Sequence, residues 1–344
     1  MKRLGNLYDQ IISLDNLRLA DERARKGKLN SYGVKLHDRN KEANLLSLHE
    51  ALKAGTYRTS KYSTFTIYEP KEREIFRLPY FPDRIVHHAV MNILEPIWVS
   101  IFTADTYSCI KGRGIQAAAN KLRRVINRDK KGCAYCLKID IRKFYPSIVH
   151  SVLKSIVRRK IKDTRLLNLL DEIIDSAEGL PIGNYLSQYL ANLILAYFDH
   201  WVKEVKRIKY YFRYADDIVV LHSDKKMLHV LLTEFESYLN ENVRLEVKQN
   251  KQVFPVARDH RDSFGRGIDF LGYVFYLNET RLRKRIKQNL CKKVAKLRKR
   301  KKPIGEAEFK QTLAAWWGWA KYSDSKYLIN KLNKIAPYEI KFKR

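Results

Sequence analysis

Aspartates stand at the ends of apolar, strand-like runs, and this pattern constrains the fold more than any other in the chain. The runs are 135–141, which carries Asp140, and 209–214 and 218–222, which flank Asp216 and Asp217. Aspartate is a poor strand residue, so its presence between apolar neighbours requires a reason. We predict a hairpin with acidic residues at its tip, beside another strand that ends in a carboxylate.

Neighbouring buried carboxylates repel one another unless cations neutralise them. Three carboxylates on two adjacent strands have the oxygen ligands that two Mg²⁺ ions about 4 Å apart require. Such a pair activates an attacking oxygen and stabilises a leaving oxygen during phosphoryl displacement. Taken singly, Asp216 and Asp217 also fit a polar hairpin tip, and Asp140 fits a helix cap. Their combination in a basic chain favours the metal site.

The charge balance indicates a polyanionic partner. The 344 residues include 68 Lys and Arg against 37 Asp and Glu, a net charge of +31. Nucleic acid is the simplest such partner. An apolar content of 45% supports a sizeable core, and the length suits about two domains.

Cysteine usage suggests a reducing compartment, and the hydropathy of the sequence argues against a membrane span. Four cysteines do not form a disulfide framework, and we interpret Cys133 and Cys136 as structural residues. No apolar run approaches the roughly 20 residues that span a bilayer, and the first ten residues lack the apolar segment of a signal peptide. We expect a soluble cytoplasmic protein without membrane contact.

Hydrophobic periodicity predicts a chain that mixes helices and strands. The predicted helices are a pair over 6–54 separated by a basic loop, then 84–102, 115–126, 148–170, 185–205, 227–239, 281–302 and 306–332. Further strands are predicted over 61–68, 75–78, 243–256 and 267–276. The segment 281–302 holds 13 Lys or Arg and no acid around an apolar stripe, as expected for a basic helix along a nucleic-acid duplex.

Several motifs together resemble those of reverse transcriptases, most closely the enzymes of diversity-generating retroelements. Tyr214-Ala-Asp-Asp217 is similar to the family's Tyr-x-Asp-Asp box, and Asp140 followed by Phe144-Tyr-Pro-Ser-Ile148 resembles its first catalytic motif. The box Gly179-Leu-Pro-Ile-Gly-Asn-Tyr-Leu-Ser-Gln188 carries the Ser-Gln that indicates the diversity-generating group. The order Phe144-Tyr145 departs from the two phenylalanines of many members.

The resemblance implies roles for individual residues. It implies catalysis and metal binding by Asp140, Asp216 and Asp217, with Ile141 as a further metal ligand. It implies dNTP binding by Lys71, Arg73, Tyr145, Ile182 and Gln188, with Tyr145 as a steric gate against the 2′-hydroxyl. It implies template or primer contacts for Arg113, Gly272, Tyr273, Arg283 and Arg285. Lys251 is a candidate general acid, with Lys248 and a solvated surface lysine as alternatives.

The expected fold class is therefore α+β, a right-hand polymerase with fingers, an antiparallel ferredoxin-like palm and a helical thumb. We expect an N-terminal helical extension and the start of the fingers over 1–70, fingers with the first palm elements over 71–135, the palm over 136–280 and a basic thumb over 281–344. The tryptophans at 316, 317 and 319 are interpreted as core residues of the last part.

The expected function is RNA-directed DNA synthesis with dNTPs and two Mg²⁺ ions. The resemblance implies copying of a retroelement RNA into cDNA with errors at template adenines, and a complex with a basic helical-bundle accessory protein. A defence-associated or retron-like reverse transcriptase is an alternative. A non-catalytic RNA-binding scaffold is an alternative of another class, which the charge alone fits equally well.

Overall fold

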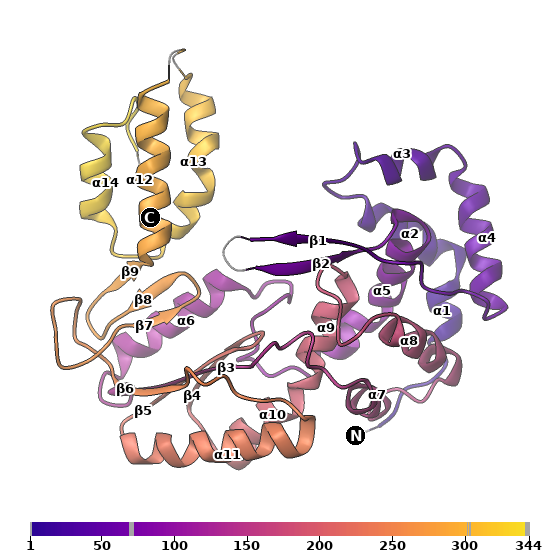
Figure 1. The fold of residues 1–344 in the computed structure, drawn as a ribbon, viewed down its shortest axis with the longest axis horizontal. Coiled ribbons are helices and arrows are strands. Elements are labelled where there is room, and N and C mark those ends of the chain that lie inside the picture. The colour runs from indigo at the N-terminus through magenta and orange to yellow at the C-terminus, as the bar shows by residue number, and fades with distance from the viewer. Residues whose placement is uncertain (1, 69–71, 301, 303, 341–344) are drawn as a thin grey trace. The chain divides into compact units, whose positions relative to one another are not determined.

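The computed structural model describes residues 2–68, 72–300, 302 and 304–340 (Figure 1). The chain divides into two compact units, each assembled from separated segments. Unit 1 comprises Met1–Cys109, Ile141–Lys206 and Phe235–Lys248; unit 2 comprises Ile110–Asp140, Arg207–Glu234 and Gln249–Arg344. None of the described helices has the length and apolar character needed to cross a bilayer.

Unit 1 is mainly helical. Its N-terminal helices are α1 (Tyr8–Ile12), α2 (Leu14–Ala24), α3 (Tyr32–Asp38) and α4 (Lys41–Lys53). Helix α2 packs on the long helix α5 (Ile85–Val99), where Leu17, Val90 and Leu94 are fully buried. The predicted pair of helices over 6–54 is thus four helices. The predicted basic loop does separate α2 from α3.

The rest of unit 1 is a hairpin and a second group of helices. Strands β1 (Ser63–Ile67) and β2 (Arg73–Arg77) pair antiparallel, followed by the short turn η1 (Tyr80–Arg84). The later elements are α7 (His150–Arg158), α8 (Thr164–Asp175), α9 (Tyr185–Ile194), α10 (Ala196–His200) and η2 (Trp201–Val205). Helix α9 packs on α5 and on α7. The prediction of a single helix over 148–170 is wrong, because the helical structure is interrupted between α7 and α8.

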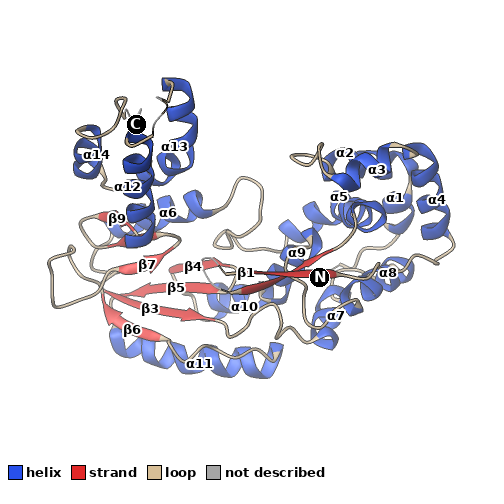
Figure 2. Cartoon of the chain, turned by 45° about the horizontal axis from the view of Figure 1, so that its top comes forward, coloured by secondary structure: helices blue, strands red, loops and turns tan. Residues whose placement is uncertain are grey.

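A four-stranded antiparallel sheet forms the centre of unit 2. Its strands are β3 (Tyr135–Asp140), β4 (Tyr210–Tyr214), β5 (Asp217–His222) and β6 (Gln252–Pro255), in the order β4-β5-β3-β6 (Figure 2). Counted along the chain this is the order 2-3-1-4, which read from the other edge is the 4-1-3-2 order of a ferredoxin-like palm. Helix α6 (Ile115–Arg128) packs on β4, and α11 (Lys225–Val243) connects β5 to β6.

A smaller sheet and three helices complete unit 2. Strands β7 (Ile268–Phe270), β8 (Tyr273–Phe275) and β9 (Thr280–Leu282) form an antiparallel sheet, followed by α12 (Lys284–Arg298), α13 (Glu306–Lys321) and α14 (Lys326–Asn333). Helix α12 buries Leu290, Val294 and Leu297 and packs on α13. Most of its lysines and arginines are exposed, which confirms the predicted basic amphipathic helix.

Several sequence predictions in unit 2 need correction. The strand predicted over 267–276 is two strands, β7 and β8, that pair across a turn. The basic helix begins at Lys284, because the residues before it pair in β9. The strand predicted over 243–256 is mostly wrong: only β6 forms, and α11 extends to Val243. The helix predicted over 306–332 is divided into α13 and α14, and its three tryptophans are half-buried. Of these, Trp319 contacts the buried ring of Tyr273.

Candidate active site

The three predicted catalytic carboxylates meet at one end of the unit 2 sheet. Asp140 and Asp217 are direct cross-strand partners in the β3–β5 pair, and Asp217 is also paired with Tyr214 of β4. Side chains of directly opposed residues lie on the same face of a sheet, with Cβ atoms about 5 Å apart. Asp216 stands in the adjacent turn. The sheet register therefore brings together residues separated by the whole middle of the chain.

The hairpin turn that carries Asp216 is strained. Strands β4 and β5 are joined by only Ala215 and Asp216, and Ala215 adopts a φ of 54°. Residues with a β-carbon enter this left-handed region at a cost of about 1–3 kcal/mol, and such strain collects at functional sites. The guanidinium of Arg213, which is fully buried, donates to the Ala215 carbonyl at 3.2 Å and so supports the turn.

Burial and repulsion shape the electrostatics of these carboxylates. Burial is the largest cause that raises the pKa of Asp217, which reaches about 6, and the charges of Asp140 and Asp216 raise it further. Lys138 and Arg283 oppose this rise. Cation binding would therefore relieve an unfavourable concentration of negative charge.

The donor set suits a hard divalent cation. Oδ1 of Asp217 is buried and has no hydrogen-bond partner within the described part of the chain. Carboxylate oxygens are the ligands that Mg²⁺ prefers. As the side chains stand, no group of three His, Cys, Asp or Glu residues among those described is already arranged to hold a metal ion. Asp140, Asp216 and Asp217 are thus chemically suitable ligands whose side chains would have to converge on the ion.

A cavity of about 620 Å³ in unit 2 includes two of the predicted template or primer residues. Arg113 and Tyr273 line it together with Tyr214, the first residue of the Tyr-Ala-Asp-Asp box. Its other lining residues are Gly112, Gly114, Ile115, Gln116, Ala117, Asn120, Ala315, Gly318, Trp319 and Tyr322. Aromatic faces, amides and one guanidinium are the groups that contact nucleotides in single-stranded sites.

The predicted primer-contact glycine, Gly272, has a structural explanation in unit 2. It lies in the turn between β7 and β8 with a φ of +83°, and its carbonyl accepts a hydrogen bond from the Arg283 N–H at 2.9 Å. A β-carbon built on Gly272 would come within 2.5 Å of the Trp319 ring and 2.8 Å of Ile286. The glycine therefore lets the tryptophan ring pack directly on the backbone.

Several predicted dNTP-binding residues gather in unit 1. The Leu180 N–H donates to the Tyr145 carbonyl at 2.9 Å, and the Phe76 N–H donates to the Ile182 carbonyl at 2.8 Å. The loop that contains Ile182 is thus bonded both to the turn of Tyr145 and to strand β2, which carries Arg73. Tyr145, Ile182 and the strand of Arg73 form one cluster.

The remaining predicted site residues are placed as follows. Lys71 lies outside the described residues. Gln188 is half-buried on α9, Lys251 is half-buried just before β6, and Arg285 is exposed in the first turn of α12. Ile141 is buried and forms an isolated antiparallel bridge with Val247. Arg283 forms an ion pair with Asp269 at 2.5 Å. Their functional roles stay predictions.

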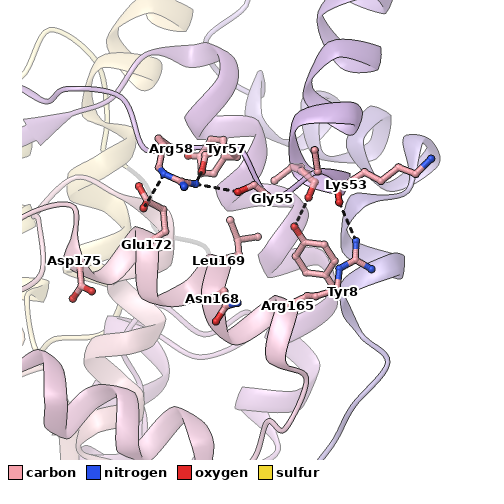
Figure 3. A pocket seen from close by; sticks show the side chains of 12 residues that line it. Tyr8, Lys53, Gly55, Tyr57, Arg58, Arg165, Asn168, Leu169, Glu172 and Asp175 are labelled. Carbon is pink, nitrogen blue, oxygen red and sulfur yellow. Dashed lines mark hydrogen bonds and ion pairs between the residues drawn. The ribbon is translucent and has the colours of Figure 1, made fainter.

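Unit 1 contains a second cavity, of about 510 Å³, between the end of α4 and helix α8 (Figure 3). Its arginines are already engaged by neighbouring groups. Arg58 donates to the carbonyls of Gly55 and Tyr57 and approaches Glu172, while Arg165 pairs with Asp9 and lies 4.3 Å from the centre of the Tyr8 ring. These contacts make the cavity a structural junction and a poorer candidate for a charged substrate.

The sequence matches a known protein family across the catalytic region. A family model described as reverse transcriptase (RNA-dependent DNA polymerase) matches residues 70–275, which include all three carboxylates. The chain belongs to this reverse transcriptase family. The match and the palm topology confirm the predicted right-hand polymerase fold. Reverse transcriptases generally use divalent metal ions, in agreement with the donor set described above.

This reverse transcriptase is similar to several curated proteins. It is 25% identical to protein YkfC of Escherichia coli K12 over 255 residues, covering 60% of this chain and 65% of YkfC. It is 24% identical to the group II intron-encoded protein LtrA of Lactococcus lactis over 231 residues, covering 62% of this chain and 38% of LtrA. The chain thus spans less than two thirds of either relative. A telomerase structure from Candida albicans aligns with a TM-score of 0.48 and 10% identity over 83% of this chain and 58% of that chain.

One basic residue at the carboxylate centre of this reverse transcriptase was not predicted from the sequence. Lys138 precedes Asp140 by two residues in an otherwise apolar strand, and its Nζ lies 3.6 Å from Oδ1 of Asp217. A lysine within an apolar strand is as unexpected as an aspartate there, so the same signal could have identified it. The cavity residues Gln116 and Trp319 carried no comparable signal.

Proposed function

We propose that this chain is an RNA-directed DNA polymerase that makes cDNA from a retroelement RNA by nucleotidyl transfer. The observation that carries the proposal is the cross-strand pairing of Asp140 with Asp217, beside Asp216, in a chain of the reverse transcriptase family. A metal-free scaffold would gain nothing from three adjacent carboxylates at the end of a sheet, since their repulsion destabilises the fold.

Asp140, Asp216 and Asp217 would hold two Mg²⁺ ions, with the Ile141 carbonyl as a further ligand. When bound, the ions would activate the primer 3′-hydroxyl and stabilise the leaving pyrophosphate. The fold positions the three carboxylates: the β3–β5 register fixes Asp140 and Asp217, and the strained Ala215 turn holds Asp216. Lys251 is proposed as the general acid for the leaving group.

Substrate binding is proposed for the two groups of residues described above. Arg73, Tyr145, Ile182 and Gln188, together with Lys71, would bind the incoming dNTP, with the Tyr145 ring against its sugar. Template and primer would be contacted by Arg113, Gly272, Tyr273, Arg283 and Arg285. The net charge of +31 and the exposed basic face of α12 support binding of a duplex through its phosphates.

A finer proposal concerns the type of retroelement. The Ser187-Gln188 pair in the 179–188 box supports membership of the diversity-generating group. We therefore propose error-prone copying at template adenines, a cytoplasmic location, and a basic helical-bundle accessory protein as partner. The proposed division is an N-terminal extension over 1–70, fingers over 71–135, palm over 136–280 and thumb over 281–344.

The test is primer extension on a defined RNA template with Mg²⁺ and dNTPs, with and without the accessory protein. Wild type is compared with the double variant Asp216→Asn/Asp217→Asn and with Asp15→Asn, which makes the same change on a side chain that is 99% exposed. We expect cDNA from wild type and Asp15→Asn only. No synthesis by any chain, with tight RNA binding retained, would overturn the proposal in favour of a scaffold.

Sequencing of the cDNA tests the finer proposal. Errors concentrated opposite template adenines would support the diversity-generating type. Faithful cDNA would reject that type and favour a retron-like or defence-associated reverse transcriptase.

A further inference from the structure

Lys138 places a fixed positive charge beside the carboxylates of unit 2. In the β3–β5 register it is opposite Val219, so it is the diagonal neighbour of Asp217 on the same face of the sheet. Its Nζ lies 3.6 Å from Oδ1 of Asp217, the buried oxygen that lacks a hydrogen bond among the described residues. Both side chains are about one quarter exposed, at 25% and 24%.

A second contact holds the lysine in place. Nζ of Lys138 donates a hydrogen bond to the backbone carbonyl of Asp269 in β7. The carboxylate of Asp269 accepts a hydrogen bond from Nε of Arg283 at 2.6 Å, and Arg283 immediately precedes helix α12. Lys138 thus connects a carboxylate of the candidate site with the residues that support the first turn of the basic helix.

The position of Lys138 matters for cation binding. An ammonium group near a partly desolvated carboxylate stabilises its charge, but it also repels any cation that approaches the same oxygen. Asp140 and Asp216 provide no such compensation, since they add negative charge. A lysine here therefore favours the metal-free arrangement of the carboxylates and makes divalent-ion binding weaker than the carboxylates alone would make it.

We propose that Lys138 is a positioning residue that balances the charge of Asp217 when no divalent ion is bound and that a binding ion must displace. When the Lys138 ammonium is displaced from Asp217, it keeps its hydrogen bond to the Asp269 carbonyl. This inference rests on the proposed use of divalent ions by Asp140, Asp216 and Asp217. It assigns the lysine no direct contact with substrate.

The test is a Mn²⁺ titration of the full chain without nucleic acid, in which electron paramagnetic resonance monitors the free and bound ion. Lys138→Met removes the charge at similar length, and Lys138→Arg retains it. We expect Lys138→Met to bind Mn²⁺ about fivefold more tightly than wild type, and Lys138→Arg to resemble wild type. In an Asp217→Asn background, Lys138→Met should have no effect on Mn²⁺ affinity.

Thermal unfolding provides a second readout that does not depend on polymerase activity. We expect Lys138→Met to lower the Tm in EDTA and Mn²⁺ to restore it, because the ion replaces the missing charge. A purely structural lysine would give a loss that Mn²⁺ does not restore and an unchanged Mn²⁺ affinity, and either result would overturn the inference. Failure of wild-type primer extension would instead count against the proposed function, so the two failures are distinguishable.

Discussion

The indole ring of Trp319 packs on the backbone of Gly272, so that a β-carbon on this glycine would approach ring atom Cζ3 within 2.5 Å. The Tyr273 hydroxyl next to it donates to the Trp319 carbonyl at 3.1 Å, and the Tyr273 ring contacts the indole. These contacts fix helix α13 to the β7–β8 turn within unit 2.

Gly272→Ala should therefore destabilise the C-terminal part of unit 2. Two costs add in this variant: the strain of an alanine at the left-handed φ of +83° and the clash with Trp319. Overpacking of this kind costs about 1–3 kcal/mol. Thermal unfolding followed by tryptophan fluorescence measures the loss. In the double variant Gly272→Ala/Trp319→Ala the clash with the indole ring is absent, so the two effects should be less than additive. Strictly additive losses would show that the ring does not determine the need for glycine.

Gly179→Ala should disturb the turn that carries Tyr145. Gly179 has a φ of +61°, and a β-carbon there would lie 2.6 Å from the carbonyl oxygens of both Tyr145 and Pro146. Backbone atoms cannot move aside as a flexible side chain can, so we expect a raised KM for dNTPs in primer extension. Gly27→Ala is the matched control, because Gly27 has a φ of +71° and nothing within 4 Å of the added carbon. Equal effects of both variants would contradict the prediction.

Asp21→Asn should destabilise unit 1 at neutral pH. Asp21 is fully buried and contacts Arg25 at 2.6 Å and Lys41 at 3.2 Å, and the Tyr80 hydroxyl donates to it. Removing one partner of a buried ion pair costs about 3 kcal/mol. Asp38→Asn, which changes a 43% exposed partner of the same Arg25, should cost much less. Urea unfolding of the three proteins gives the comparison.

The same network predicts the pH dependence of this loss. Burial would raise the pKa of Asp21, but the hydrogen bonds from Tyr80, Arg25 and Lys41 outweigh it and hold the pKa below the ordinary 3.8. A lowered pKa stabilises the folded state above the unfolded pKa, and this contribution is lost as the pH falls through the folded pKa. Wild type and Asp21→Asn should therefore converge in stability in acid. A gap that does not narrow as the pH falls below the ordinary pKa of 3.8 would contradict the assignment.

The cysteines should divide into two classes of reactivity. Cys133 and Cys136 are fully buried, and burial raises the pKa of both thiols, that of Cys133 to about 12. Cys109 and Cys291 are half-exposed. We expect a maleimide to label only Cys109 and Cys291 in the native chain and all four after denaturation, as measured by mass spectrometry. Fast native labelling of Cys136 would show that strand β3 opens locally, and fast labelling of Cys133 would show that the turn before β3 opens.

Local sequence determined the type of most elements and the carboxylate site. Helices α5 and α6 and the β4–β5 hairpin follow from apolar periodicity, because a helix or strand that buries one face must repeat at its own period. The carboxylates were recognisable because aspartate conflicts with its apolar strand neighbours. Such conflicts between local preference and fold are expected at functional sites.

Tertiary contacts decided where helices end. Asp163 separates α7 from α8: its carboxylate accepts hydrogen bonds from the Leu7 and Tyr8 N–H groups as well as from Leu166 at the start of α8. Asp324 separates α13 from α14, and its carboxylate accepts from the Thr280 N–H and pairs with Arg123. Both aspartates are bound to segments distant in sequence, which periodicity cannot reveal.

Lys138 shows the same limit at the candidate site. The sequence places it two residues before Asp140, but its contacts with Asp217 and with the Asp269 carbonyl arise from strand register and from the β7 segment. Sequence alone therefore indicated which residues are candidates for the chemistry, because unusual residue types are visible locally. Only the tertiary structure decided which charges meet, because side-chain interactions depend on distances that the fold sets.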